Sequence, residues 1–116
     1  MTHKDLEVYR ETMTFIVSVY RITDTLPDSE RFGLSSQMRR AAVSIASNIA
    51  EGAAHSSTKE FIRFLYHSLG SAAELETQLE VAIQLGFSQR NEVPIDQLTK
   101  IRKMLIGLIN SLKKKL

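Results

Sequence analysis

The side chains with the clearest chemical potential lie between Gln37 and Gly52, in a stretch that is otherwise rich in alanine. Polar residues recur there by steps of four, three and four: Arg40, Ser44, Ser47 and Glu51. In a helix, such spacing places side chains along one face. Because alanines flank these groups, we expect them to be shielded from water, and shielded polar groups need hydrogen-bonding partners.

An arginine and a carboxylate on neighbouring helices can form a bidentate ion pair, and Glu74 is the acid expected to meet Arg40. One interpretation is a structural polar network that fixes the register of two helices, with the members Gln37, Arg40, Asn48, Glu51 and Glu74. The other is a site for a ligand or RNA built on Arg39 and Arg40. The residues alone leave both interpretations open.

The residue types that catalysis requires are scattered or missing. The chain has no cysteine, and its three histidines, His3, His55 and His67, have no second histidine at the spacing of zinc ligands. A di-metal bundle needs Glu-x-x-His, but Gly52 and Phe64 stand three residues before His55 and His67. Neither a Gly-x-Ser-x-Gly motif nor a glycine-rich phosphate loop occurs. We therefore expect no enzyme activity, no metal, no cofactor and no small-molecule substrate.

Positive charge collects at the carboxy-terminal end of the sequence. The formal net charge is only +2, but residues 97–116 contain six lysines or arginines and no acid. These cations could simply offset the negative pole of a helix dipole. The alternative is contact with nucleic acid, for which the candidate residues are Arg39, Lys100, Lys103, Lys113, Lys114 and Lys115.

Four segments with helical periodicity must position these side chains. We expect helices over about 5–26, from Ser35 or Ser36 to about Glu51, over about 57–85, and from about Pro94 to the terminal lysines. Pro27 stops the first helix, and Ser57 with Glu60 has the spacing of a capping box. Short connections make neighbouring helices antiparallel. The predicted fold is all-α, an up-and-down antiparallel four-helix bundle that forms one domain over residues 1–116.

The first helix carries two apolar seams. One consists of Leu6, Tyr9, Met13, Ile16, Tyr20 and Thr23, and the other of Val8, Thr12, Phe15, Val19, Ile22 and Leu26. So wide an apolar arc is explained either by deep burial or by contact with a second subunit. In the second case, the predicted oligomer interface contains Val8, Phe15, Val19 and Ile22.

Small residues occupy matching places in the second and third helices. Ala41, Ala42, Ala46 and Ala50 lie in the second, and the run Gly70–Ala73 lies at the middle of the third. Small side chains let helix backbones approach closely. We therefore expect these two helices to pack unusually close together.

Two stretches resemble a known family: QMRRAAVSIASNIAEG at 37–52 and EFIRFLYHSLGSAAELET at 60–77. They resemble the 23S rRNA intervening-sequence protein family, also called the four-helix bundle protein family. The resemblance implies an up-and-down bundle and a cyclic homopentamer, which favours the intersubunit interpretation of the wide apolar arc. It also implies similarity to the accessory protein of diversity-generating retroelements, which binds nucleic acid and a reverse transcriptase. Ala53, Ala54 and His55 stand where family members often carry a basic residue.

The function expected from these observations is a non-catalytic, oligomeric adaptor that associates with RNA or a nucleoprotein complex. A protein scaffold without a role in nucleic-acid binding is the alternative, and a small-molecule binder using Arg40, Glu51 and Glu74 is a third. The expected partners are further copies of the chain and RNA, without a membrane. The charged amino terminus lacks the apolar core of a signal peptide, so we expect a bacterial cytoplasmic protein.

Overall fold

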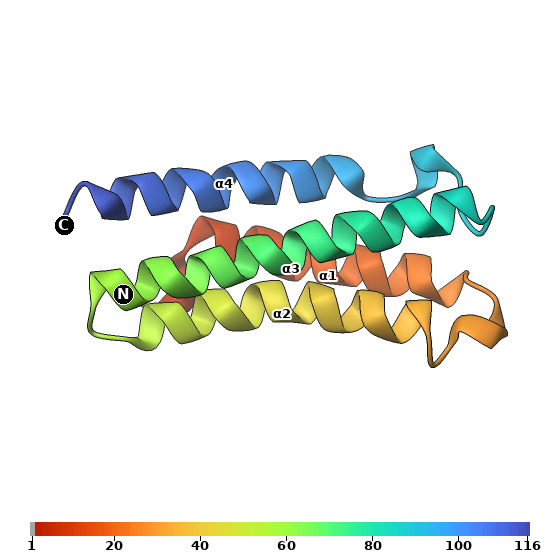
Figure 1. Ribbon diagram of the computed structural model, residues 1–116, viewed down its shortest axis with the longest axis horizontal. Coiled ribbons are helices and arrows are strands. Elements are labelled where there is room, and N and C mark those ends of the chain that lie inside the picture. Colours follow the sequence, from red (N-terminus) through yellow and green to blue (C-terminus); the bar gives the residue numbers. More distant parts are fainter. Residues whose placement is uncertain (1) are drawn as a thin grey trace.

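Four antiparallel α-helices run up and down along one axis (Figure 1). The structure is a computed structural model that describes residues 2–116. Its α-helices are α1 (Glu7–Asp24), α2 (Leu34–Ala54), α3 (Thr58–Gln84) and α4 (Ile95–Lys113), with short 3₁₀ turns at His3–Asp5, Asp28–Glu30 and Arg90–Glu92. The predicted four-helix bundle is confirmed. Within residues 2–116, no helix combines the length and the apolar character needed to cross a membrane.

The ends of α3 follow the signals in the sequence. The Ser57 hydroxyl accepts a hydrogen bond from the Glu60 backbone N–H at 3.2 Å, as an N-cap does. At the other end, Gly86 has a φ of +78°. The Phe87 N–H bonds to the Ala82 carbonyl at 2.9 Å and the Gly86 N–H to the Ile83 carbonyl at 3.0 Å, which together form a Schellman motif. Glycine is favoured at this position because it has no Cβ.

Helix α2 is longer than predicted at both ends. It begins at Leu34, whose backbone N–H donates to the Glu30 carboxylate at 3.2 Å, and neither Ser35 nor Ser36 caps it. It also continues past Gly52 to Ala54. Gly52 faces α3 at a point where no side chain fits, and it does not end the helix, so the predicted end at about Glu51 was wrong.

The core contains side chains from all four helices. The largest fully buried ones include Phe15 of α1, Met38 and Ile45 of α2, Leu65 and Leu75 of α3, and Leu98 and Leu105 of α4. The seam predicted to contact another subunit belongs to this core, because Val8 is 4% exposed and Phe15 and Val19 are 0% exposed within the single chain. Ile22 is half-buried and packs against the same core. The prediction of an oligomer interface through these residues was therefore wrong.

The other seam of α1 is the one that reaches the surface. Met13 is 44% exposed and Tyr20 is 40% exposed, while Tyr9 and Ile16 are half-buried at the edge of the core. Of the two explanations for the wide apolar arc, bundle packing accounts for one seam completely. It leaves the second seam partly uncovered.

Helices α2 and α3 approach each other closely, as their small residues predict. The Ser68 hydroxyl of α3 is fully buried and donates to the Ile45 carbonyl of α2 at 2.9 Å. A Cβ on Gly52 would lie 2.8 Å from Phe64 Cβ and 3.0 Å from Phe61 Cδ1. The side chain of one helix thus touches the backbone of the other at two separate levels of the bundle.

Candidate nucleic-acid interface

The polar network between α2 and α3 consists of hydroxyls and one amide. Ser44 Oγ and Ser71 Oγ lie 2.8 Å apart across the two helices, so one hydroxyl donates to the other. Asn48 Nδ2 donates to Ser44 Oγ at 3.1 Å and to the Ser44 carbonyl at 2.9 Å. Asn48 is therefore the one member of the predicted network that takes part, and it does so through Ser44, whose hydroxyl contacts Ser71 across the two helices.

The predicted pair of Arg40 and Glu74 does not form. Arg40 is exposed and, within residues 2–116, makes no hydrogen bond or ion pair. Glu74 is exposed and accepts a hydrogen bond from Gln78 Nε2 at 3.2 Å, while Gln37 and Glu51 lie exposed on α2. The prediction of a charged network was wrong because helices this close would strip water from an ion pair. Two serine hydroxyls satisfy each other there at a smaller desolvation cost.

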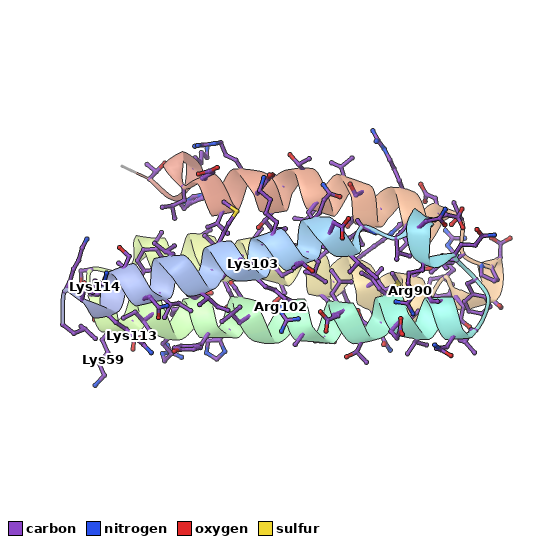
Figure 2. The ribbon with its side chains drawn as sticks, turned by 90° about the horizontal axis from the view of Figure 1, so that it is seen from above. Lys59, Arg90, Arg102, Lys103, Lys113 and Lys114 are labelled. Atoms are coloured by element: carbon purple, nitrogen blue, oxygen red, sulfur yellow. The ribbon has the colours of Figure 1, made fainter. Side chains whose placement is uncertain are left out.

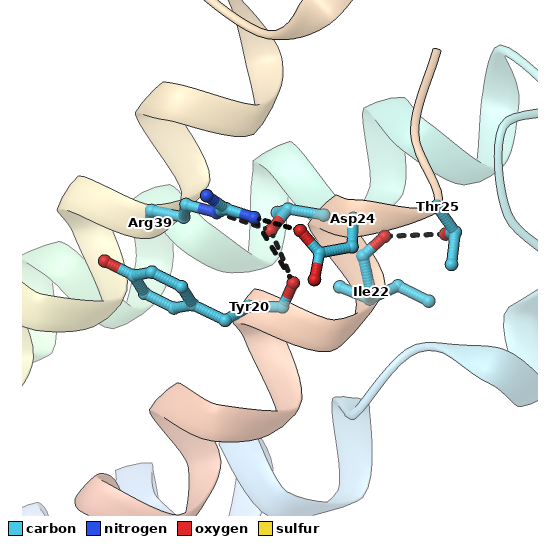
Figure 3. A network of polar contacts seen from close by, with 6 residues as sticks. Tyr20, Ile22, Asp24, Thr25 and Arg39 are labelled. Carbon is cyan, nitrogen blue, oxygen red and sulfur yellow. Dashed lines mark hydrogen bonds and ion pairs between the residues drawn. The ribbon is translucent and has the colours of Figure 1, made fainter. Parts of the chain in front are cut away.

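Arg39 ties α1 to α2 (Figure 3). Its Nε donates to Thr23 Oγ1 at 2.7 Å, and its Nη2 donates to Asp24 Oδ1 at 2.7 Å. The guanidinium also lies over the Tyr20 ring, with Cζ 4.5 Å from the ring centroid. These contacts give Arg39 a structural role in place of the predicted contact with nucleic acid.

Exposed lysines from α3 and α4 share one face of the bundle (Figure 2). We call this surface the basic face and define it by Lys59 of α3, Lys103 and Lys113 of α4, and Lys114 at the end of α4. Figure 2 shows Lys59, Lys113 and Lys114 together at one end of the bundle, with Lys103 nearer its middle. Lys115 is exposed next to them in the chain. The antiparallel packing of α3 and α4 brings Lys59 to the terminal lysines.

Three acids of α3 are each paired with an arginine: two lie on the side of the basic face, and the third, Glu80, lies toward the other end of the bundle, where Figure 2 shows its partner Arg90. Glu60 pairs with Arg63 at 2.8 Å, Glu76 with Arg102 at 2.5 Å, and Glu80 with Arg90 at 2.9 Å. The hydrogen bond from Arg63 holds the pKa of the Glu60 carboxyl below its usual value, and that from Arg90 does the same for the pKa of Glu80. Because arginines neutralise these acids, the lysines keep their charge available for an external anion.

Tyr66 of α3 adds an aromatic ring to the basic face. Lys113 Nζ donates to the Tyr66 hydroxyl at 2.8 Å and lies 5.3 Å from the centroid of its ring. The ring is 48% exposed, so one side of it is free for a ligand. Along α3, Lys59, Arg63 and Tyr66 follow one another at helical spacing. That spacing was the signal by which the sequence could have placed Tyr66 among the basic residues.

The histidines lie against aromatic rings. His55 stacks on Phe64 with ring centroids 5.0 Å apart, and His3 meets the edge of Tyr9 at 4.8 Å. The Phe64 ring also lies 5.8 Å from His67. No group of three or more His, Cys, Asp or Glu side chains in residues 2–116 is arranged to hold a metal ion.

Lys100 lies one turn before Lys103 on α4, at the side of the helix that faces α1. Its Nζ forms an ion pair with Glu11 Oε1 of α1 at 2.5 Å. The hydrogen bond that Lys100 donates to the Glu11 carboxylate raises the pKa of Lys100, which keeps the ammonium charged. Lys100 therefore joins α4 to α1 and is not part of the basic face, contrary to the prediction that grouped it with the other lysines.

Residues 4–107 match a family described as 23S rRNA-intervening sequence protein. The chain belongs to this family. A solved structure from Bacteroides thetaiotaomicron, described as a protein with unknown function from the S23 ribosomal protein family, is similar in fold, with a TM-score of 0.81. The two sequences are 29% identical, and the similarity covers 89% of this chain and 95% of that one. The comparison with curated proteins finds no match.

The family match divides the basic face. It includes Lys59 and Lys103 but ends at residue 107, before Lys113 and Lys114 and the adjacent Lys115. The 23S rRNA-intervening sequence family therefore accounts for the bundle and the α2–α3 contact. The terminal lysines, and the Lys113–Tyr66 contact that depends on them, lie beyond the matched residues.

Proposed function

We propose that this member of the 23S rRNA-intervening sequence family is a non-catalytic, self-assembling adaptor that binds RNA through its phosphate backbone. The observation that carries the proposal is the basic face, where Lys59, Lys103, Lys113 and Lys114 are exposed while the neighbouring acids Glu60 and Glu76 are paired with arginines. Cations without acidic partners attract a polyanion and release its counterions on binding. The expected place of action is the bacterial cytoplasm.

The dimensions of the basic face suit a nucleic-acid backbone. Lys103 and Lys114 are eleven residues apart in the chain, a separation of roughly 17 Å along a helix. A duplex carries about ten phosphate charges over that length, so four lysines can each meet a phosphate. Such contacts position a protein on RNA without reading its sequence. Each chain would bind weakly and with little specificity.

Assembly of several copies would turn weak contacts into useful affinity. The resemblance that points to a ring of five copies implies five basic faces on one particle. Binding of a second face to the same RNA is then intramolecular, and avidity can exceed single-site affinity by about 10² to 10⁴. An adaptor of this kind holds an RNA or nucleoprotein partner without chemistry of its own.

Titration of a structured RNA with the purified chain at about 50 and 200 mM salt tests the proposal. Four phosphate contacts on a duplex predict that the logarithm of the binding constant falls with the logarithm of the salt concentration with a slope of about −3.6 per chain. The control is a protein of similar size and net charge that lacks a clustered basic face. Affinity no higher than that of the control, or a slope near zero, would contradict RNA binding through this face.

A protein scaffold without an RNA partner is the second candidate function. It is favoured by the large apolar side chains that the structure leaves exposed on α1, α2 and the loop between them: Met13, Val17, Tyr20, Phe32 and Val43. Affinity capture from the native host, with and without nuclease, separates the two functions. Partners that survive nuclease treatment support a scaffold, and partners lost on treatment support an RNA adaptor.

A further inference from the structure

The ring of Tyr66 lies in the open among the lysines of the basic face. It is 48% exposed and follows Lys59 and Arg63 on the same side of α3, two turns and one turn later. Lys113 reaches it from the neighbouring helix α4. A lysine can offer a nucleic acid only a charge, whereas an aromatic ring can stack on a base.

Lys113 contacts the edge of the Tyr66 ring and leaves its face open. Its Nζ lies 2.8 Å from the Tyr66 hydroxyl oxygen but 5.3 Å from the ring centroid. A nitrogen so near to the oxygen and so far from the centroid lies beyond the hydroxyl and not above the ring. The cation is therefore placed to meet a phosphate at the edge of the ring, while the exposed face of the ring is available to a base.

The neighbours of Tyr66 along α3 also leave space beside the ring. Arg63 is turned toward Glu60, whose Oε2 lies 2.8 Å from its Nη2, and its Cζ lies 4.6 Å from the centroid of the Phe64 ring. One turn after Tyr66 stands Gly70, where a Cβ would have no atom of residues 2–116 within 4 Å apart from the backbone of its own helix. A base has room to lie against this part of α3.

Ile106 of α4 extends the apolar surface beside Tyr66. One hydrogen bond joins Arg102 of α4 to Glu76 of α3. Because Lys113 is bonded to Tyr66 in the same way, the two contacts fix the register of these antiparallel helices. Ile106 follows Arg102 by four residues and precedes Lys113 by seven, so it lies on the same side of α4 between the two contacts. Its side chain is 49% exposed.

The basic face offers more to an unpaired base than to a base pair. Lys103 precedes Ile106 by one turn, and Lys114 follows Lys113 at the end of α4 (Figure 2), so cations lie before and after the apolar surface. The bases of a duplex are stacked on one another, and their faces are hidden from a flat protein surface. A duplex therefore meets the lysines alone. The bases of a loop or a free end are unstacked and can reach an aromatic side chain as well.

We propose that Tyr66 stacks on an unpaired base, with Ile106 beside it, and that the basic face consequently prefers single-stranded segments of RNA. This inference rests on the proposed binding of RNA by the basic face and names the form of RNA that this face selects. Every base has an aromatic face, so the preference is for an unpaired strand and not for a sequence. The lysines attract any phosphate backbone, and the ring distinguishes one form from the other.

Two RNA probes of equal length separate stacking from charge. One is an unstructured oligoribonucleotide of about 12 nucleotides, within the site sizes of single-strand binding folds, and the other is a duplex of that length. Tyr66→Leu removes the ring without changing the charge. The residue is exposed, so the variant keeps its fold, which far-ultraviolet circular dichroism verifies. We expect the ratio of single-strand affinity to duplex affinity to fall about 5- to 100-fold in this variant.

A conservative variant and the salt dependence distinguish stacking from an effect that passes through Lys113. Tyr66→Phe keeps the ring and removes the hydroxyl that Lys113 contacts, and it should retain the preference for the single strand. Stacking releases no counterions, so Tyr66→Leu should keep the salt slope of the unaltered chain on the single strand. Lys113→Gln removes a phosphate contact and should reduce that slope by about 0.7.

Phe32→Leu is the matched control for the loss of an exposed ring. Phe32 is 90% exposed and precedes α2, whereas Lys59 follows the other end of that helix. The two residues therefore lie at opposite ends of the bundle. Phe32→Leu should leave the affinities for both probes at the values of the unaltered chain.

Several results would overturn the inference, and each has a different meaning. Equal losses on the two probes in Tyr66→Leu would give Tyr66 only the role of positioning Lys113. A loss in Tyr66→Phe as large as that in Tyr66→Leu would assign the preference to the hydroxyl. A chain that binds both probes and is insensitive to Tyr66→Leu binds RNA without stacking, so the proposed function would stand without this inference. A chain that binds neither probe would remove both.

Discussion

Arg39 Nε donates to Thr23 Oγ1 at 2.7 Å, which joins the second turn of α2 to the last turn of α1. The same guanidinium donates to Asp24 at 2.7 Å and covers the Tyr20 ring. Three successive features of α1 thus converge on one side chain of α2. Two adjacent arginines in a sequence suggest a nucleic-acid ligand, but here Arg39 is bound within the protein, and Arg40 has no hydrogen bond or ion pair among residues 2–116.

Replacing Arg39 tests this structural role. Arg39→Met removes the hydrogen bonds to Thr23 and Asp24, and we expect the free energy of unfolding to fall by about 1–2 kcal/mol. Urea denaturation measures the change. The matched control is Arg21→Met, which removes an exposed arginine of α1 and should change stability by less than about 0.5 kcal/mol. Equal losses in the two variants would contradict the role given to Arg39.

Substitution of Gly52 tests how closely α2 and α3 approach each other. In Gly52→Ala the new Cβ would meet Phe64 Cβ at 2.8 Å, and we expect overpacking to destabilise the protein by about 1–3 kcal/mol. Gly107→Ala is the control, since no atom lies within 4 Å of its Cβ position on α4. Alanine is the better helix former there and should stabilise the protein by about 0.5–1 kcal/mol. Opposite signs in urea denaturation are the expected result, and equal signs would contradict it.

Periodicity was sufficient to predict four helices and both apolar seams of α1, because a repeat of 3.6 residues leaves a visible pattern. It could not show which seam faces inward, since both are apolar. One signal was present: the seam that reaches the surface contains Tyr9 and Tyr20, whose hydroxyls need water or a polar partner, whereas the buried seam contains Phe15 and Val19. Side-chain chemistry, more than spacing, distinguishes the two.

The polar network between α2 and α3 could be predicted only in part from the sequence. The residues Ser44 and Asn48 were identifiable on α2 from their spacing among alanines, but Ser71 on α3 was not. A partner across two helices depends on their relative register, which the pattern of one helix does not contain. Charge favoured Glu74 as the partner, whereas the distance between the helices favours the smaller hydroxyl.

A double-mutant cycle measures the contact between these two serines. Ser44→Ala and Ser71→Ala each remove one side of a hydrogen bond of 2.8 Å. We expect a coupling free energy of about 0.5–1.5 kcal/mol between the two substitutions. Ser47 provides the control because its side chain is exposed on α2, so Ser47→Ala with Ser71→Ala should be additive. Additive losses for Ser44 and Ser71 would show that the hydroxyls do not interact.

The pairing of Glu80 with Arg90 predicts a pH effect with a definite sign. The hydrogen bond from Arg90 lowers the pKa of Glu80 from its ordinary 4.5, so the ion pair stabilises the fold above that pH. The stabilisation is lost as the pH falls through the lowered pKa. Carboxyl chemical shifts in a nuclear magnetic resonance titration should give a pKa below 4.5 for Glu80. Arg90→Met should raise it, and Arg102→Met, which removes the partner of Glu76, should leave it unchanged.

The arrangement of lysines, and not the net charge, is expected to govern RNA binding. The triple variant Lys103→Gln, Lys113→Gln and Lys114→Gln removes three charges from the basic face. Each lost phosphate contact should reduce the salt slope by about 1, so we expect a reduction of about 3 per chain. A matched triple, Lys4→Gln, Arg10→Gln and Arg21→Gln, removes the same charge from exposed residues at the amino-terminal turn and on α1.

The two triples lower the net charge equally, so a general attraction to RNA would weaken to the same extent in both. If the basic face binds RNA, only the first triple loses affinity, and the second keeps the slope of the unaltered protein. The fold is not at risk in either, because all six side chains are exposed. Equal losses of RNA affinity in the two variants would show that the basic face contributes only through the overall charge. Such a result would remove the main support for an RNA adaptor.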